Sequence, residues 1–401
     1  MKIFLKTALL LLLSSQFIFA QQKEMVLRSN SNQISIKEGN STYRDQWTLS
    51  PKLRPDIFVA NAFDKIQDIV FFSAIDTISF KVIRNKKYDF VIVNGSDSAF
   101  TQISTYATEI PTLKPKLIYK KTKNQDWQPD TLKFLLGKDN YIHIKGTVNG
   151  SDSLDFIFDT GAGTNVITSS LVNTKVNLKI DQSVNNKGAD GVSTVEKSLK
   201  NTILLQDISL ENAPLVLVDY KGFPFEAVLG WIVFDDKIVE IDYDKKLLII
   251  HSQLPPLAID YTKLDMKMIS GIPYIKCKIV VGEKEADGWF DLDTGSDGTL
   301  SLSQKFATAN QLNGVMDKLG KSTSRGSAGI AFTKQKVQLP KLKIGKYELY
   351  QIPIHINDAD PKGMEHQENI GNKILKRFNS LIDFKNRAIY LKPNKLLYSE
   401  M

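Results

Sequence analysis

The chain has 401 residues, of which 42% are hydrophobic and 24% charged, so it is long and apolar enough for two or three globular domains of ~100–200 residues each. Cys277 is its only cysteine, which excludes an intramolecular disulfide. The net charge of +8 does not identify a partner, because the densest basic run, residues 114–123, has no nucleic-acid-binding motif around it. We interpret that run as the solvated face of a linker and expect no nucleic-acid partner.

The first twenty residues have the pattern of a secretory signal peptide. Lys2 and Lys6 form a positive start, an apolar run follows, and the stretch ends in Ala20. We therefore expect residues 1–20 to be removed and the mature protein to be exported, either to the periplasm or out of the cell as a secreted protein. No later apolar run reaches the ~18 residues of a spanning helix, so no transmembrane segment is expected in the mature chain.

Residues 21–130 are predicted to form an N-terminal β-rich accessory region. Alternating runs such as "TISFKVI" and "YDFVIV" are typical of strands, and "PDIFVANAFDKIQDIV" (55–70) predicts one helix. No residue of this region points to a chemical role.

The rest of the chain also alternates apolar and polar residues over short runs separated by glycine, asparagine and proline turns, which predicts an all-β fold. Three further short helices are predicted at residues 169–176, 303–312 and 371–378. Pro255 and Pro256 break this part of the chain into two units, residues 131–253 and 258–395.

The two units repeat the same order of motifs. Asp159 and Asp293 each open an Asp-Thr-Gly tripeptide after an apolar run, 293 − 159 = 134 residues apart. Each unit then has a glycine-bearing hairpin, "KGADGV" (187–192) and "RGSAGI" (325–330). The spacing from the later glycine to the next aspartate is 242 − 230 = 12 residues in the first unit and 383 − 371 = 12 in the second. This agreement indicates an internal duplication.

Two aspartates supplied by similar lobes can share one proton, since like charges at close range cannot both ionise easily. The ionised carboxylate can then act as a general base on a water molecule, and the protonated one can polarise a peptide carbonyl. Thr160 and Thr294 can each reach the opposite loop, while Gly161 and Gly295 let backbone approach the carboxylates where a Cβ would obstruct it.

With these motifs, residues 131–395 resemble the single-chain aspartic proteases of the retropepsin and pepsin type, in particular exported bacterial members. The resemblance implies a bilobal fold of pseudo-twofold β-barrel lobes and hydrolysis of polypeptide or peptide substrates as an aspartic endopeptidase. It makes Asp159 and Asp293 the catalytic pair, supported by Thr160, Gly161, Thr294, Gly295 and Ser296. It implies no metal and no organic cofactor, and an active site that needs no homodimer because both motifs lie in one chain.

Three departures from the family pattern stand out. Ala162 follows the first loop glycine where pepsin-like members have a hydroxyl that hydrogen-bonds the carboxylate, whereas Ser296 keeps a hydroxyl in the second loop. Losing one such bond raises the pKa of the pair, so we expect a less acidic pH optimum than in gastric-type enzymes. Neither hairpin has the tyrosine of a pepsin-like flap. Asp291, two residues before Asp293, has Ile157 as its counterpart, and it either perturbs the pair or turns into solvent.

Other interpretations remain. One Asp-Thr-Gly alone is better read as a turn after a strand, and only the two copies in register argue against that. A catalytically silent peptide-binding module of the cell envelope with the same fold is the main alternative. Metal binding is not expected, because the four histidines (His143, His251, His355 and His366) form no ligand motif.

Overall fold

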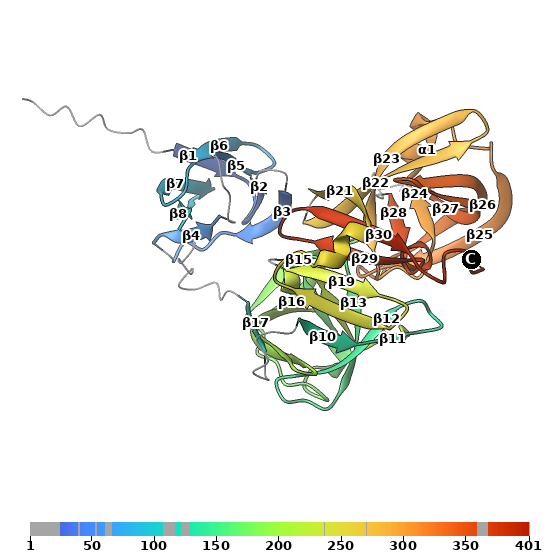
Figure 1. Ribbon diagram of the computed structural model, residues 1–401. Helices are drawn as coiled ribbons and strands as arrows, with labels where there is room; N and C mark the ends of the chain where they lie inside the picture. The colour runs from blue at the N-terminus through green and yellow to red at the C-terminus, as the bar shows by residue number, and fades with distance from the viewer. Residues whose placement is uncertain are drawn as a thin grey trace, which may run out of the picture.

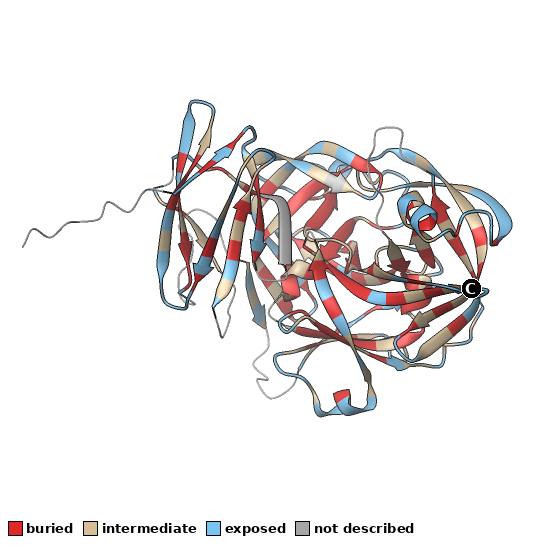
Figure 2. Cartoon of the chain, turned by 90° about the horizontal axis from the view of Figure 1, so that it is seen from above, coloured by how far each residue is buried: buried red, intermediate tan, exposed pale blue. Residues whose placement is uncertain are grey.

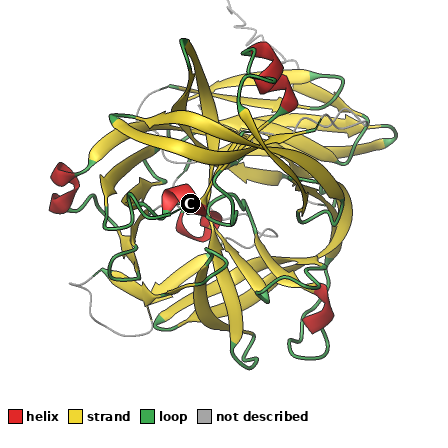
Figure 3. Ribbon diagram, turned by 90° about the vertical axis from the view of Figure 1, so that its right-hand side faces the viewer, coloured by secondary structure: helices red, strands yellow, loops and turns green. Residues whose placement is uncertain are grey.

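The computed structural model describes residues 25–38, 41–52, 54–60, 66–106, 117–121, 129–235, 237–269, 271–358 and 368–400, except for the side chains of residues 41–46 and 187. Across these ranges strands dominate, which confirms the all-β class (Figure 3). The α-helices in the described ranges are two short ones, α1 (Gln304–Ala309) and α2 (Asn372–Leu375). Neither helix is long and apolar enough to cross a membrane. The predicted signal peptide and His366 lie outside the described residues.

The N-terminal region folds into two four-stranded sheets, drawn in blue at one end of the molecule in Figure 1. The first sheet has the order β1 (Met25–Ser29), β7 (Lys87–Asn94), β8 (Asp97–Ser104), β4 (Asp56–Val59). The second has the order β3 (Ser41–Thr48), β2 (Gln33–Glu38), β5 (Gln67–Phe72), β6 (Thr77–Val82). Their buried faces enclose a separate core that includes Trp47, Phe71 and Phe90. This core is independent of the rest of the protein.

The helix predicted over residues 55–70 is wrong where the structure describes that stretch. Asp56–Val59 pairs with β8 in parallel, and Gln67–Phe72 pairs with both β2 and β6. In β5 the buried residues Ile69 and Phe71 alternate with less buried ones, which is the two-residue period of a strand. The tertiary pairing therefore overrides the apolar spacing that suggested a helix.

The other predicted helices have mixed outcomes. The stretch 169–176 contains only a 3-10 turn, Ser169–Leu171. The stretches 303–312 and 371–378, predicted as helices, contain the shorter helices α1 and α2. Helix α1 begins after Ser303, whose hydroxyl accepts a hydrogen bond from the Phe306 N–H at 3.0 Å and so caps the first turn. Two more 3-10 turns are Trp231–Phe234 and Pro256–Asp260.

Two closed six-stranded rings of the same topology follow along the chain. The first contains, in order, β12 (Ile142–Val148), β13 (Leu154–Asp159), β18 (Ala227–Gly230), β14 (Asn165–Thr168), β17 (Ile208–Val218) and β16 (Gly191–Leu205). The second contains β22 (Ile272–Val281), β23 (Lys284–Asp293), β28 (Asn369–Gly371), β24 (Leu300–Leu302), β27 (Tyr347–Asn357) and β26 (Ala331–Ile344). The pairings β12–β16 and β22–β26 close the rings. The duplication predicted from motif order is therefore present in the strand topology.

Additional strands extend each ring. In the first lobe these are β11 (Leu135–Leu136) on β12, β9 (Ile118–Lys121) on β17, and β15 (Gln182–Gly188) on β16. In the second lobe they are β21 (Thr262–Ile269) on β22 and β25 (Asp317–Arg325) on β26. The β15–β16 and β25–β26 pairs form two hairpins, called here the first and second hairpin. They contain the two glycine-bearing turns predicted from the sequence.

An antiparallel sheet joins the lobes. Its order is β10 (Asp130–Lys133), β20 (Leu247–His251), β19 (Ile238–Asp242), β29 (Phe378–Asp383), β30 (Ala388–Pro393) and then β21. Glu240 pairs with Leu381 at its centre. The two repeats are offset by 371 − 230 = 141 residues, measured between their equivalent glycines. Adding this offset to Glu240 gives residue 381, so this pair joins equivalent residues of the two lobes. The pseudo-twofold axis passes between them.

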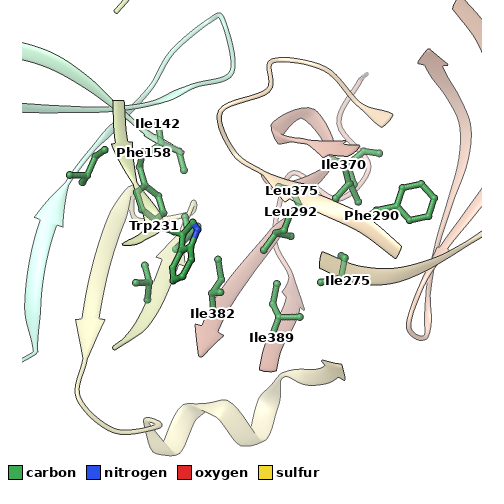
Figure 4. Close-up of a cluster of buried hydrophobic side chains, with 14 of the residues drawn as sticks. Ile142, Phe158, Trp231, Ile275, Phe290, Leu292, Ile370, Leu375, Ile382 and Ile389 are labelled. Carbon is green, nitrogen blue, oxygen red and sulfur yellow. The ribbon is translucent and has the colours of Figure 1, made fainter. Parts of the chain in front are cut away.

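One continuous hydrophobic core runs through both lobes and the joining sheet (Figures 2 and 4). Trp231 lies at the junction, 1% exposed. Its ring stacks on Phe384 at a centroid distance of 5.0 Å, and its Nε1–H donates to the Gly271 carbonyl at 2.9 Å. The N-terminal domain touches this body as well, since Asn185 Nδ2 of the first hairpin donates to Gln33 Oε1 at 3.1 Å.

Replacing Trp231 by alanine should lower the free energy of unfolding by about 3–5 kcal/mol, because it removes a large buried ring and leaves the Gly271 carbonyl without its donor. Chemical denaturation followed by circular dichroism measures this. Ile259→Ala, at a site that is 90% exposed, is the control and should leave the midpoint nearly unchanged. Equal effects of the two substitutions would contradict the role given to Trp231.

Candidate active site

Asp159 and Asp293 end the equivalent strands β13 and β23. Asp159 lies opposite Gly230 of β18, and Asp293 lies opposite Gly371 of β28, both in parallel register. Each aspartate is thus the last residue of its strand and pairs with one of the two glycines, Gly230 and Gly371, whose equal spacing to a later aspartate indicated the repeat. The structure brings all of the predicted site residues to the junction of the lobes.

Thr160 and Thr294 bind the two loops to each other. The Thr160 N–H donates to the Thr294 hydroxyl at 3.0 Å, and the Thr294 N–H donates to the Thr160 hydroxyl at 3.0 Å. The Thr294 hydroxyl donates to the Phe158 carbonyl at 2.8 Å, and the Thr160 hydroxyl donates to the Leu292 carbonyl. Both threonines are buried. These crossed hydrogen bonds hold the two aspartates at a fixed separation.

Gly161 and Gly295 each lie against the aspartate of the opposite lobe. A Cβ on Gly161 would be 2.8 Å from Cγ of Asp293, and a Cβ on Gly295 would be 2.2 Å from Cγ of Asp159. Any side chain at these positions would push the carboxyl groups apart. The third residue of each Asp-Thr-Gly is therefore required by the close approach of the two loops.

The two carboxyl groups differ in their electrostatic surroundings. Burial raises the pKa of Asp159, but the N–H groups of Gly161, Gly295 and Ala162 donate to it and oppose that rise; the Gly161 bond is 2.7 Å long. Burial raises the pKa of Asp293 well above its usual range, and the charges of Asp159 and Asp291 raise it further. Asp159 is consequently the group that ionises first, and Asp293 is the group that keeps the proton.

Asn369 supplies the side-chain donor to the second carboxyl group. Its Nδ2 donates to Asp293 Oδ2 at 2.5 Å. The hydroxyl of Ser296, for which the family resemblance implies this role, instead accepts the Gly298 N–H at 3.4 Å. Sequence reasoning missed Asn369, although its position two residues before Gly371 in "ENIGNKIL" offered a signal, because that placement puts it on the same face of β28.

Asp291 lies next to the pair and does not turn fully into solvent. It is half-buried on β23, opposite Asn369 of β28, and its Oδ1 has no hydrogen-bond partner. Burial raises the pKa of Asp291 well above its usual range, and the charge of Asp159 raises it further. Of the two alternatives left open by the sequence, the structure supports a carboxyl group that perturbs the pair.

The tips of the two hairpins dock on each other. Asp190, buried in the turn of the first hairpin, accepts the Ala328 N–H at 2.9 Å and the Ile330 N–H at 2.7 Å from the second. Asn186 Nδ2 donates to the carbonyl and the hydroxyl of Ser327, both at 3.1 Å. The two lobes are therefore bridged a second time, far from the threonine contacts along the sequence.

Aromatic side chains of the first lobe cluster with Ala162, the residue that follows the first Asp-Thr-Gly. The pKa of Tyr220 is raised by burial and by the charges of Asp159, Asp190 and Asp293. Tyr220 packs against Phe225 at a centroid distance of 5.1 Å. Neither hairpin turn contains a tyrosine.

One comparison with known proteins bears on the first lobe of this site. A family model described as aspartyl protease matches residues 144–233, which contain Asp159 and Gly230. This match supports an aspartyl-protease-like family and function. Comparison with curated proteins gives no significant match. The matched residues lie in the first lobe, and the second lobe is related to them through the internal repeat.

No group of three or more histidine, cysteine, aspartate or glutamate side chains in the described ranges could hold a metal ion.

Thr160→Val should lower the free energy of unfolding by about 2 kcal/mol, because the Leu292 carbonyl loses its donor and the Thr294 N–H loses its acceptor in a buried site. Thr160→Ser keeps the hydroxyl and is the matched control. Denaturation of the two variants and the wild type measures the difference. Thr160→Val with wild-type stability would show that the loops are held by other contacts.

Asp190→Ala should speed hydrogen exchange at the Ala328 and Ile330 amides by about tenfold or more, since each loses a charge-assisted hydrogen bond. Exchange followed by mass spectrometry on fragments of the second hairpin measures this. Asp181→Ala is the control, because Asp181 accepts the Leu199 N–H at the base of the first hairpin and makes no such contact with the second hairpin. Unchanged exchange in Asp190→Ala would contradict the bridging role of this carboxylate.

Proposed function

We propose that the protein is an aspartic endopeptidase that hydrolyses peptide bonds with a water molecule activated between Asp159 and Asp293. The observation that carries the proposal is the crossed arrangement of the two Asp-Thr-Gly loops, in which each glycine lies against the opposite carboxyl group. Such an arrangement serves no evident packing purpose, since it brings two half-buried carboxyl groups together. Burying like charges is unfavourable and is typical of sites that use a shared proton.

The asymmetry of the pair assigns a role to each aspartate. The ionised Asp159 takes a proton from water as the water oxygen bonds to the scissile carbonyl carbon, and the proton on Asp293 passes to the carbonyl oxygen. The resulting tetrahedral diol collapses when the carbon–nitrogen bond breaks. Asp159 then gives its proton to the leaving nitrogen, and one hydroxyl of the diol returns a proton to Asp293 as the carboxylic acid forms. An acid and an amine are released, and the pair again holds one proton, on Asp293. Asn369 holds the Asp293 carboxyl group in position through its Nδ2.

A silent peptide-binding module remains the second candidate function. Both carboxyl groups, both threonines and both glycines are present in the geometry just described, which favours the enzyme. For the location we retain export after removal of residues 1–20, on the strength of the N-terminal sequence pattern. We also propose that the N-terminal domain is an accessory part of the enzyme, because its core is separate and its contact with the lobes includes the first hairpin.

Asp159→Asn and Asp293→Asn should each reduce cleavage of an unfolded protein or mixed peptide library by about 100-fold or more, because each removes the base or the acid of the reaction. Assays from pH 3 to 7 should give a bell-shaped profile with its optimum in mild acid. Circular dichroism confirms that each variant is folded. Equal cleavage by the wild type and both variants would exclude the proposal, and no cleavage by the wild type would favour the binding module.

Asn369→Val should move the alkaline limb of the pH profile to higher pH. The amide of Asn369 stabilises ionised Asp293, so its loss raises the pKa of that group and the proton is retained further up the scale. Valine occurs at the equivalent position 228 of the first lobe and fits a strand. Asn369→Asp, which replaces the donor by an ionisable acceptor, serves as comparison. If the alkaline limb of Asn369→Val does not move, Asn369 does not affect the pKa of the pair.

A further inference from the structure

The strand register makes it possible to compare the two lobes residue by residue on the face that carries the aspartates. Ile157 and Asp291 each stand two residues before the aspartate, and residues 228 and 369 stand two before the glycine. Val166 pairs with residue 228 as Ser301 pairs with residue 369. The remaining equivalences follow from the parallel pairings of β14 with β17 and of β24 with β27.

In the first lobe this face is apolar and closed. Its five positions are all buried, none more than 5% exposed: Ile157, Val166, Val216, Val218 and Val228. They form one cluster with Tyr141 and Phe225, whose rings lie 5.6 Å apart. We call these five residues the first-lobe face.

In the second lobe every one of the five positions is polar. The equivalent residues, called here the second-lobe face, are Asp291, Ser301, His355, Asn357 and Asn369. Asn357 is only 4% exposed, while the other four are half-buried. A barrel face that is sealed by valine and isoleucine in one lobe is thus polar and partly open in the other. Packing alone would favour the same apolar residues in both copies.

Two side-chain oxygens of the second-lobe face are buried without a hydrogen-bond partner: Oδ1 of Asp291 and Oδ1 of Asn357. Buried acceptors left unpaired are unfavourable, and most such groups in proteins have a partner. Both oxygens belong to the face that carries Asp293. A donor brought there by a bound molecule would satisfy them.

Side chains of both charge types border the second-lobe face, since Lys336 pairs with His355, Lys334 pairs with Asn357, and Asp291 is part of the face. Burial, and after it the charges of Lys334, Lys336 and Lys373, lower the pKa of His355 to about 4, and these lysines would repel a cation. Two carboxyl groups also border the face, because Asp291 belongs to it and Glu368 directly precedes Asn369. An anion would have to approach these carboxyl groups. A neutral group with hydrogen-bond donors and acceptors fits both sides.

We propose that the second-lobe face is a subsite for a neutral hydrogen-bonding side chain of the substrate, namely serine, threonine, asparagine or glutamine. The inference rests on the proposed function, since it identifies the substrate residue that lies beside the aspartates on the side of the second lobe. The residue on the other side meets the first-lobe aromatic groups Tyr141 and Tyr220 and is apolar. Ser301 and Asn357 determine the polar preference without touching the reacting atoms.

The double variant Ser301→Val/Asn357→Val tests this. It gives two of the five positions of the second-lobe face the valine found at the equivalent position of the first lobe. Cleavage of a defined peptide library by the wild type should show serine, threonine, asparagine or glutamine on one side of the cut bond and apolar residues on the other. The double variant should lose about tenfold in kcat/KM on peptides with glutamine or asparagine there and keep or gain rate on apolar ones. Ser301→Thr/Asn357→Ser retains hydrogen-bonding groups and should keep the wild-type preference.

A binding measurement separates this inference from the proposed function. Non-cleavable reduced-amide peptides with Phe-Gln, Gln-Phe or Phe-Phe at the centre are titrated into the Asp159→Asn protein by calorimetry, with and without the double substitution. One glutamine peptide should bind more tightly than Phe-Phe, and the double substitution should remove that difference. If the wild type cleaves nothing but this binding preference is seen, the polar subsite is supported and the proposed endopeptidase activity is contradicted. Equal binding of all three peptides, or a preference that survives the double substitution, overturns the subsite. Single Ser301→Val is used if the double variant does not fold.

Discussion

The geometry of the candidate site depends on four hydrogen bonds made by two threonine hydroxyls. Each hydroxyl accepts an N–H from the opposite loop and donates to a carbonyl of the strand that leads into that loop. Because each threonine follows an aspartate directly, any shift of one loop would move both carboxyl groups. Two lobes that are otherwise joined by a sheet and a shared core are in this way fixed to each other at the atoms where chemistry would take place.

The same contact makes the site electrostatically uneven. Backbone N–H groups gather on Asp159, whereas Asp293 receives one side-chain donor and lies beside a further carboxyl group, Asp291. A symmetric pair would share its proton equally. Here the surroundings of the two aspartates hold the proton on the second lobe, and the departures from symmetry lie in residues that the repeat does not conserve between its copies, such as Ile157 against Asp291.

Much of this could be predicted from the sequence, for identifiable reasons. The two Asp-Thr-Gly tripeptides and the equal glycine-to-aspartate spacings are local patterns, and the strand topology shows the duplication that they indicated. Asn369 could not be placed with the same ease, because its contact with Asp293 depends on the register of two strands 76 residues apart. The bridge from Asp190 to the second hairpin spans 138 residues and has no sequence pattern at all. The predicted helix at 55–70 failed because apolar spacing over a short run does not distinguish a helix from strands whose partners lie elsewhere in the chain.

The fusion of both lobes into one chain has a consequence for how a peptide would lie in the site. In an assembly of two identical subunits, every substitution occurs twice, and the two halves of the site present the same surface to a ligand. An extended peptide has a direction, and a symmetric site cannot tell its two orientations apart. In this chain one lobe has valines where the other has asparagines, serine and histidine. Such a site distinguishes the amino-terminal from the carboxy-terminal half of whatever strand it holds.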